Sequence, residues 1–225
     1  MITLAVDAST YVGTVAVIED GRLLADAEAT MRGRDAEALM PATAATLARA
    51  RKSPSDLGRV VCGAGPGSFT SLRIAASIAK GIALGVGCPM FAVSSLALLV
   101  AASGNPSEGR YLAVLDALRG DAYVGGFAVG VDGDVSSLLP ERLVMQSEVD
   151  QLAAKLGART IGTGRQVESA PHARGVLALA SILAAAGPVD VARWQPEYGR
   201  KAEAQTRWEA AHGKLLPPDP SSRVP

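Results

Sequence analysis

The sequence predicts an α/β protein built from two lobes, each with a mixed sheet that contains an antiparallel meander and is flanked by helices. Three observations lead to this prediction. The order strand, strand, strand, helix, strand, helix occurs twice along the 225 residues. A segment rich in glycine, serine and proline, 103–109, separates the two occurrences. Each occurrence opens with a short apolar strand that ends in an acid, Asp7 in the first and Asp116 in the second.

The first lobe begins with three strands. Ile2–Asp7 is an apolar run, 12–18 is rich in β-branched residues, and 22–29 returns after a Glu-Asp-Gly turn. Residues 35–51 carry apolar side chains at helical spacing, so we expect a helix there. Pro41 leaves the first residue of this helix undecided, because proline fits only the first turn.

The rest of the first lobe alternates strands with helices. We expect a buried strand at 59–62, a helix from Thr70 to Val86 and a strand at Met90–Val93. A last helix follows at 94–102, with a serine as its N-cap.

The second lobe repeats this order of elements. We expect strands at 111–116, 122–131, 143–145 and 158–162, and helices at 147–156 and 171–186. The two lobes then span 1–102 and 103–200, and a cleft between them would bring Asp7 close to Asp116. Residues 201–225 are expected to form a C-terminal helix and a tail rich in proline and serine that is partly disordered.

The charges of the chain balance, with 22 basic and 22 acidic residues. No overall field therefore draws the protein to nucleic acid or to an anionic membrane. The two cysteines, Cys62 and Cys88, lie in apolar stretches without metal-ligand spacing, as is typical of thiols in a reducing compartment. The N-terminus lacks the basic residues of a signal peptide, and the apolar stretches are too short to span a bilayer, so we expect a cytoplasmic protein.

The loop GAGPGSFTSLR, residues 63–73, joins a buried strand to a long apolar helix. It lacks the lysine of a Walker A loop, the third glycine of a dinucleotide fingerprint and the second glycine of a nucleophile elbow. Two interpretations stay open. The helix N-terminus, with its free N–H groups and the charge of Arg73, would bind an anion. Alternatively, glycine and proline only permit a tight turn from strand to helix.

The helix at 70–86 is apolar or small over nearly its whole surface, and its few polar residues include Arg73 and Lys80. A helix that packs on one side of a sheet needs a single apolar stripe. This helix is therefore either buried in a large domain or covered by another chain. Because the lobes are small, we expect an interface helix, on which Gly81 and Gly85 would let a partner helix approach closely.

Several stretches together resemble one bacterial family. The TsaB (YeaZ) family is matched by GAGPGSFTSLRIAASIAKGIA, the opening LAVDAST, VSSLALL at 93–99 and DALRGDAYVG at 116–125, and the match covers most of the chain. The resemblance implies the two-lobe ASKHA fold of actin and Hsp70, which agrees with the duplicated order of elements. It also implies a dimerisation subunit that has no catalytic residue, cofactor or metal of its own.

The resemblance further implies a role in tRNA modification. Family members form dimers through helices of the first lobe, and they pair with the catalytic subunit TsaD. That subunit transfers a threonylcarbamoyl group to the adenosine beside the anticodon of ANN-decoding tRNAs, and an ATPase, TsaE, completes the assembly. The tRNA would be reached only through this complex. ATP or ADP at the partner interface stays an alternative to a chain without cofactor.

Candidate site residues follow from the resemblance. A degenerate nucleotide site is expected at Asp7, Ser9, Thr10, Gly65, Gly67, Ser68, Thr70 and Arg73. The interface helices correspond to 35–51 and 70–86. The expected dimer interface comprises Leu39, Met40, Thr43, Leu47, Ile74, Ser77, Ile78, Gly81 and Gly85. Two departures weaken the nucleotide site, since Ala8 stands where the family has threonine and Ser71 where it has glycine.

Two catalytic functions stay open as alternatives. A phosphotransferase or ATPase of the ASKHA superfamily would use Asp7 as a base or metal anchor, with Asp116 as a second acid at the cleft. A peptidase of the M22 type would need a pair of histidines spaced H-x-x-x-H, whereas His172 and His212 stand far apart in the sequence.

Overall fold

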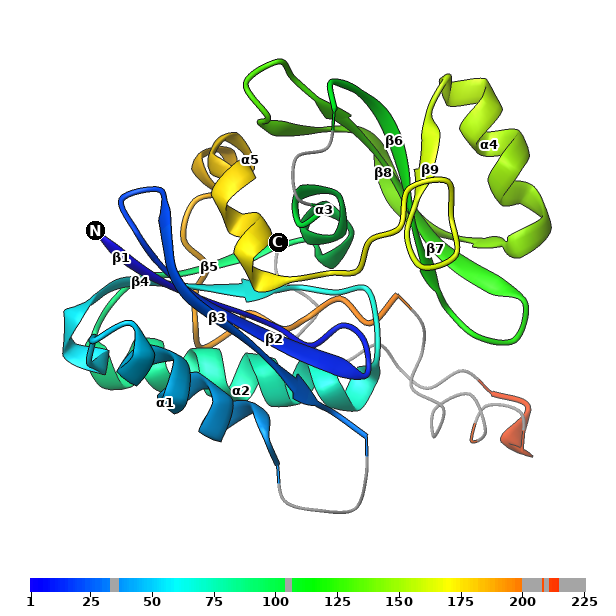
Figure 1. Ribbon diagram of the computed structural model, residues 1–225. Helices are drawn as coiled ribbons and strands as arrows, with labels where there is room; N and C mark the ends of the chain where they lie inside the picture. The colour runs from blue at the N-terminus through cyan, green and yellow to red at the C-terminus, as the bar shows by residue number, and fades with distance from the viewer. Residues whose placement is uncertain (33–36, 104–106, 200–207, 209–210, 215–225) are drawn as a thin grey trace.

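The computed structural model describes residues 1–32, 37–103, 107–199, 208 and 211–214, and it contains two sheets (Figure 1). The strands of the first sheet are β1 (Ile2–Asp7), β2 (Val12–Glu19), β3 (Arg22–Thr30), β4 (Leu57–Gly63) and β5 (Met90–Val93). The strands of the second are β6 (Gly109–Asp116), β7 (Asp121–Val129), β8 (Val135–Met145) and β9 (Arg159–Ile161). Their spatial orders are β3-β2-β1-β4-β5 and β8-β7-β6-β9.

The two sheets are built in the same way. Strands β1, β2 and β3 pair antiparallel, as do β6, β7 and β8. The first strand of each meander also pairs in parallel with a strand that comes later in the chain, β4 or β9. The duplicated order of elements and the α/β fold class predicted from the sequence are therefore confirmed.

Helices form layers outside and between the sheets, as Figure 1 shows. Helices α1 (Leu39–Arg49) and α2 (Phe69–Val86) cover the outer face of the first sheet, and α4 (Val149–Leu156) covers the outer face of the second. Between the sheets lie α3 (Ser95–Ala101), the 3-10 helix η3 (Ala173–Ala178) and α5 (Ala180–Ala186). Two further 3-10 turns are η1 (Pro54–Asp56) and η2 (Gln146–Glu148).

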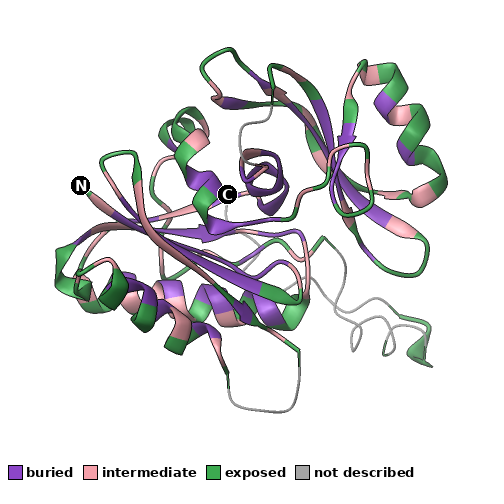
Figure 2. Cartoon of the chain, in the orientation of Figure 1, coloured by how far each residue is buried: buried purple, intermediate pink, exposed green. Residues whose placement is uncertain are grey.

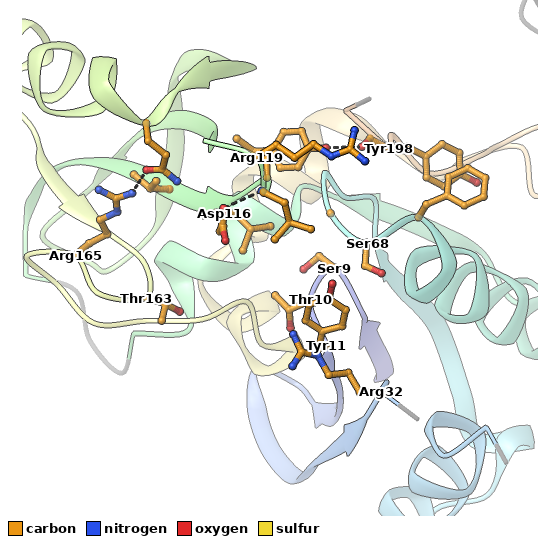
Figure 3. Close-up of a pocket in the computed structure, with 18 residues that line it drawn as sticks. Ser9, Thr10, Tyr11, Arg32, Ser68, Asp116, Arg119, Thr163, Arg165 and Tyr198 are labelled. Atoms are coloured by element: carbon orange, nitrogen blue, oxygen red, sulfur yellow. Dashed lines mark hydrogen bonds between the residues drawn. The ribbon is translucent and has the colours of Figure 1, made fainter. Parts of the chain in front are cut away.

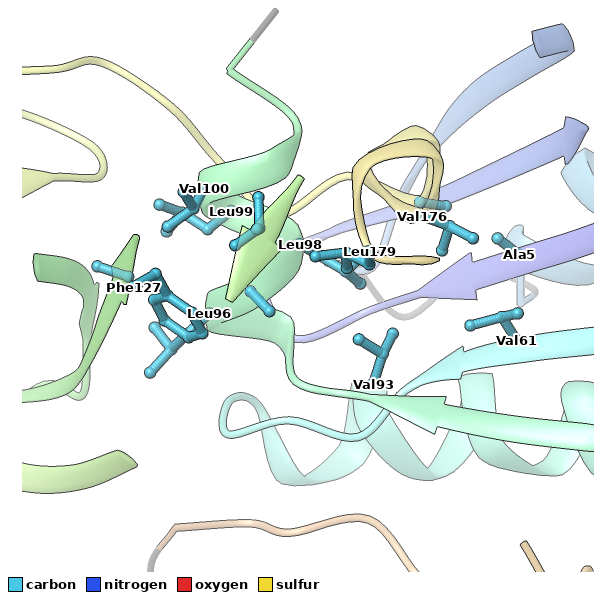
Figure 4. Close-up of a cluster of buried hydrophobic side chains, with 14 of the residues drawn as sticks. Ala5, Val61, Val93, Leu96, Leu98, Leu99, Val100, Phe127, Val176 and Leu179 are labelled. Atoms are coloured by element: carbon cyan, nitrogen blue, oxygen red, sulfur yellow. The ribbon is translucent and has the colours of Figure 1, made fainter. Parts of the chain in front are cut away.

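The central core fills the space between the two sheets (Figure 4). Helix α3 is at its centre, and five of its seven residues from Leu96 to Val100 are at most 1% exposed. Ser94 caps this helix, because its side chain accepts hydrogen bonds from the backbone N–H groups of Leu96 and Ala97. Helix α3 packs on β6, β7 and β8 of the second sheet, and its Ser95 donates a hydrogen bond to Asp7 at the end of β1, so its position fixes how the two halves of the molecule pack.

The segment after β9 returns to the first sheet. Ala173 N donates a hydrogen bond to Thr14 Oγ1 on β2 at 3.0 Å, and Val189 N donates to Met90 O on β5 at 2.8 Å. Trp194 packs against the core beneath α1 and α2. Residues that the sequence analysis assigned to the second lobe thus also contact the first.

Strand β8 and the helix expected at 171–186 differ most from their expected extents. Strand β8 begins at Val135 instead of 143, and Pro140 within it is tolerated because β8 is an edge strand. The helix expected at 171–186 is divided into η3 and α5. Gly175 in η3 lies against α3, where a Cβ would come within 2.9 Å of Leu98 O. The helix expected at 35–51 covers Leu39–Arg49, and residues 37–38 before it are described but not helical. Residues 35–36 and most of the C-terminal helix and tail lie outside the described residues.

Glu141 on β8 is half-buried near the start of α3. Its pKa is raised to about 7, chiefly because of burial, which outweighs a hydrogen bond with Ser94 that lowers the pKa, while the charge of Glu197 adds to the rise. The folded state therefore favours the protonated form, while the unfolded chain ionises near the ordinary value of 4.5. Stability is highest below that value and falls as the pH rises toward about 7.

We predict that Glu141→Gln stabilises the protein at pH 8 relative to the parent and has much less effect at pH 5. The expected gain between the two pH values is on the order of 1–2 kcal/mol, because the substitution removes the cost of a buried charge. Urea unfolding at both pH values measures it. The control is Glu108→Gln, on an exposed side chain, and equal effects of Glu141→Gln at pH 5 and pH 8 would contradict the prediction.

Candidate functional site

A cleft of about 1010 Å³ lies between turns of the two sheets (Figure 3). The first sheet contributes the β1–β2 turn and the glycine-rich loop before α2. The second contributes the β6–β7 turn and the loop after β9. The lining residues are Ser9, Thr10, Tyr11, Arg32, Gly67, Ser68, Phe69, Val114, Leu115, Asp116, Ala117, Leu118, Arg119, Tyr123, Gln146, Thr163, Arg165 and Tyr198.

Asp7, at the end of β1, is fully buried and is not among these lining residues. Ser95 Oγ donates a hydrogen bond to Asp7 Oδ1 at 2.6 Å. The N and Oγ atoms of Ser9 donate to Asp7 Oδ2 at 3.0 and 2.8 Å. Burial raises the pKa of Asp7, and these hydrogen bonds oppose the rise. The carboxylate is thus occupied by protein donors, and its geometry does not fit a general base or a metal anchor.

Backbone N–H groups of the glycine-rich loop donate hydrogen bonds to other residues of the chain. Gly65 N donates to Ser95 Oγ at 3.1 Å, and Ser68 N donates to Ser9 O at 2.7 Å. A Cβ on Gly67 would overlap the backbone of Ser9, so glycine is needed for this close approach. These contacts favour the interpretation of the loop as a tight strand-to-helix turn over that of a phosphate cradle.

The structure separates the residues expected for a nucleotide site into three groups. Ser9, Thr10, Gly67 and Ser68 line the cleft. Asp7 and Gly65 are buried and do not line it. Thr70 and Arg73 are exposed on α2 and do not line it either. The residues present do not fit a nucleotide held through Asp7 and the loop amides.

Asp116 lies in the cleft, at the start of the β6–β7 turn. Its Oδ1 accepts a hydrogen bond from Leu118 N at 2.8 Å. Leu118 and Arg119 have φ values of 62° and 59°, in the left-handed region that side-chain-bearing residues rarely adopt. This turn belongs to the stretch 116–125 that carries the family resemblance, but Arg119 was not among the expected site residues. Arg165, on the loop after β9, was not expected either, because no local sequence pattern marks it as a residue that lines the cleft.

The described residues include no group of three or more His, Cys, Asp or Glu side chains that could hold a metal ion. His172 is buried, and its Nδ1 accepts a hydrogen bond from Arg174 N at 3.1 Å, which caps η3. His212 has its Nδ1 at 2.8 Å from Trp208 O and stacks on the Trp208 ring. Each histidine therefore has local contacts that account for its position.

The expected interface residues on α1 fall on two different faces of that helix. Leu39, Thr43 and Leu47 are buried against the first sheet. These three side chains are unavailable to a partner, and the expected interface is corrected at these positions. A neighbouring face of α1, about 100° round the helix, carries Met40 and the small residues Ala44 and Ala48, all three exposed and none of them except Met40 expected from the sequence.

Figure 2 shows that the side of α2 turned away from the first sheet is largely exposed, and three of the five expected interface residues on α2 are exposed. Ser77, Gly81 and Gly85 are exposed, and Ile74 and Ile78 are half-buried against the core of the first sheet. No atom lies within 4 Å of a Cβ built on either glycine. Leu84, which the sequence analysis missed, is 68% exposed.

Helix α2 is long and apolar enough to meet the length and composition criteria for a membrane span, the only helix among the described residues to do so. Core helices of water-soluble proteins meet the same criteria. In this structure one side of α2, with Leu72, Ala75 and Ala79, packs on the first sheet, so its apolar character has a local explanation.

Comparisons with known proteins agree with one another. The family model for TsaD, tRNA N6-adenosine threonylcarbamoyltransferase, matches residues 32–171. The tRNA threonylcarbamoyladenosine biosynthesis protein TsaB of Bacillus subtilis is 31% identical over 92% of this chain and 98% of its own length. The TsaB protein of Escherichia coli is also 31% identical, over 72% of this chain and 71% of its own length.

Solved structures support the same assignment. YeaZ from Pseudomonas aeruginosa superposes with a TM-score of 0.70 at 25% identity, and the match covers 88% of this chain and 99% of that one. The similarity extends over both sheets, because it includes most of the described chain. The chain therefore belongs to the TsaB (YeaZ) family of tRNA threonylcarbamoyladenosine biosynthesis proteins.

Proposed function

We propose that this chain is a non-catalytic subunit that pairs with a TsaD-type catalytic chain through α1 and α2. The observation that supports this is an exposed apolar surface on the outer side of the two helices. We call it the α1–α2 surface, and it comprises Met40, Ala44, Ala48, Ser77, Gly81, Leu84 and Gly85.

The composition of the α1–α2 surface suits helix-to-helix contact. Six of its seven members are apolar or glycine, and its glycines and alanines offer little side-chain bulk, so a partner helix can approach the backbone closely. Leu84 is a large apolar side chain that water covers in the single chain. Burying an exposed leucine in an interface contributes on the order of 2 kcal/mol.

A TsaD-type partner is favoured because the TsaD family model matches this chain itself. Two chains with related folds can present the same helices to each other across a pseudo-twofold axis, as identical chains do across a true one. A second copy of this chain would use the same surface in the absence of the partner. In this proposal the TsaE-type ATPase joins the pair, tRNA is modified by the catalytic chain in the cytoplasm, and any ATP or ADP lies at the partner interface.

The cleft gives no comparable support to a catalytic role. Asp7 is enclosed by donors from Ser9 and Ser95, so neither a phosphotransferase base nor a metal anchor is presented there. The described residues also lack the clustered metal ligands of a metallopeptidase.

We predict that Gly81→Arg abolishes pairing with a TsaD-type chain while the fold is retained. A Cβ at Gly81 meets no atom, and arginine favours a helix over glycine by about 0.5–1 kcal/mol, so the melting temperature should stay the same or rise. The long charged side chain would hold the partner helix away. Light scattering of the mixture reports pairing, and tRNA modification by the mixture reports activation.

The matched control is Val131→Arg. Val131 is 87% exposed on the turn after β7, remote from the α1–α2 surface, so this variant should pair as the parent does. Normal pairing and full modification with Gly81→Arg would show that the proposed surface is not the interface.

We predict that Asp7→Asn destabilises the chain by about 2 kcal/mol without changing ATP turnover. The amide group cannot accept from all three donors, so a donor is left without its partner in a buried site. Thermal unfolding measures the first effect, and phosphate release by the isolated chain measures the second. Asp116→Asn, at an exposed carboxylate, serves as the control and should cost less. ATP turnover by the parent that disappears in Asp7→Asn would support a phosphotransferase or ATPase instead.

A further inference from the structure

The residues that line the cleft carry a net positive charge, unlike the chain as a whole. The whole sequence has a formal net charge of zero. The residues that line the cleft, however, include three arginines, Arg32, Arg119 and Arg165, and one acid, Asp116. Figure 3 shows the three arginines on different sides of the cleft, one just after β3, one from the β6–β7 turn and one from the loop after β9. Positive charge is thus distributed around the cavity.

Aromatic rings lie beside these arginines. Tyr11 is 42% exposed, and the guanidinium of Arg32 lies 3.8 Å from the centre of its ring. Across the mouth of the cleft, the rings of Phe69 and Tyr198 are 4.4 Å apart. The cleft therefore combines cations that bind phosphate with ring faces on which a nucleobase can stack.

The backbone of the β6–β7 turn holds two of the lining residues in an unfavourable conformation. Leu118 and Arg119 both have positive φ values. Asp116 Oδ1 accepts from Leu118 N, and Asp121 N donates to Leu118 O at 3.1 Å, so hydrogen bonds define the turn. Residues of this kind persist where the surrounding structure determines them, and they are concentrated at functional sites.

We propose that this cleft binds a single-stranded segment of the tRNA, with the arginines on phosphates and Tyr11 or Tyr198 against a base. The proposal rests on the proposed function, since that supplies tRNA as the ligand. A volume of about 1010 Å³ is at the upper end of the range for small-molecule pockets, and three separate cations suit a chain of phosphates. A free nucleotide is less well matched, because Gly65 N and Ser68 N donate within the protein.

The α1–α2 surface and the cleft belong to different faces of the first sheet. Helices α1 and α2 cover the face turned away from the second sheet, whereas the cleft opens between the two sheets. A partner chain and an RNA strand can therefore occupy the molecule together.

The test uses the full chain and a labelled hairpin RNA with the sequence of an ANN-decoding anticodon arm. Fluorescence anisotropy measures the association constant at several salt concentrations. The logarithm of this constant should fall with the logarithm of the salt concentration with a slope of about −2, because each of the three phosphate contacts on a single strand contributes about −0.7. Arg119→Gln and Arg165→Gln should each reduce the slope by about 0.7 and together weaken binding at least tenfold. Tyr11→Ala should weaken it about fivefold or more.

Arg142→Gln is the matched control, because Arg142 is exposed on β8 and does not line the cleft. Absence of RNA binding, equal affinity of the parent and the double variant, or displacement of the RNA by ATP with Mg²⁺ at stoichiometric amounts would each overturn the proposal. Pairing with a TsaD-type chain is measured on the same samples by light scattering. If the parent chain bound the RNA but did not pair with a TsaD-type chain, the result would contradict the proposed function and leave the RNA site standing.

Discussion

The hydrogen bonds of the Asp7 carboxylate join the end of β1 to the start of α3, 88 residues further along the chain. Asp7 ends β1, Ser9 begins the following turn, and Ser95 begins α3. Ser95 also exchanges hydrogen bonds with Gly65 of the glycine-rich loop, accepting from its N–H and donating to its carbonyl. Burying a carboxylate is costly unless donors surround it, and here three do. Because α3 lies between the two sheets, this network connects the glycine-rich loop to the packing of the two sheets against each other.

This arrangement changes what the most distinctive motif of the sequence means. The loop GAGPGSFT has the composition of a phosphate-binding turn, yet Gly67 serves to bring the backbone against Ser9, and Gly65 is bonded to Ser95. Its side chains at Ser68 and Phe69 still line the cleft. The loop therefore forms part of the wall of the cleft, and the charged side chains that would contact a ligand come from other turns.

The sequence was sufficient to predict the duplicated order of elements, because each strand and helix carries its own periodicity. It also predicted the serine cap of α3 and the acids that end β1 and β6. Periodicity did not reveal which stripe of α1 meets its own sheet, so buried Leu39 and exposed Met40 were placed in one interface. Arg119 and Arg165 could not be found together, because the turns that carry them become neighbours only when the second sheet forms.

Helix α2 belongs to both candidate surfaces. Its first residue, Phe69, lines the cleft and packs on the ring of Tyr198, while Gly81, Leu84 and Gly85 lie on the outer side of its last turns. The backbone of Tyr198 is in turn held by the hydroxyl of Tyr123 on β7. Because a helix moves as a rigid rod over this length, a shift of α2 along its axis would displace Phe69 relative to the second sheet. A chain bound on the outer turns and a strand bound in the cleft would thus act on the same helix, which gives the two sites a physical means of affecting each other.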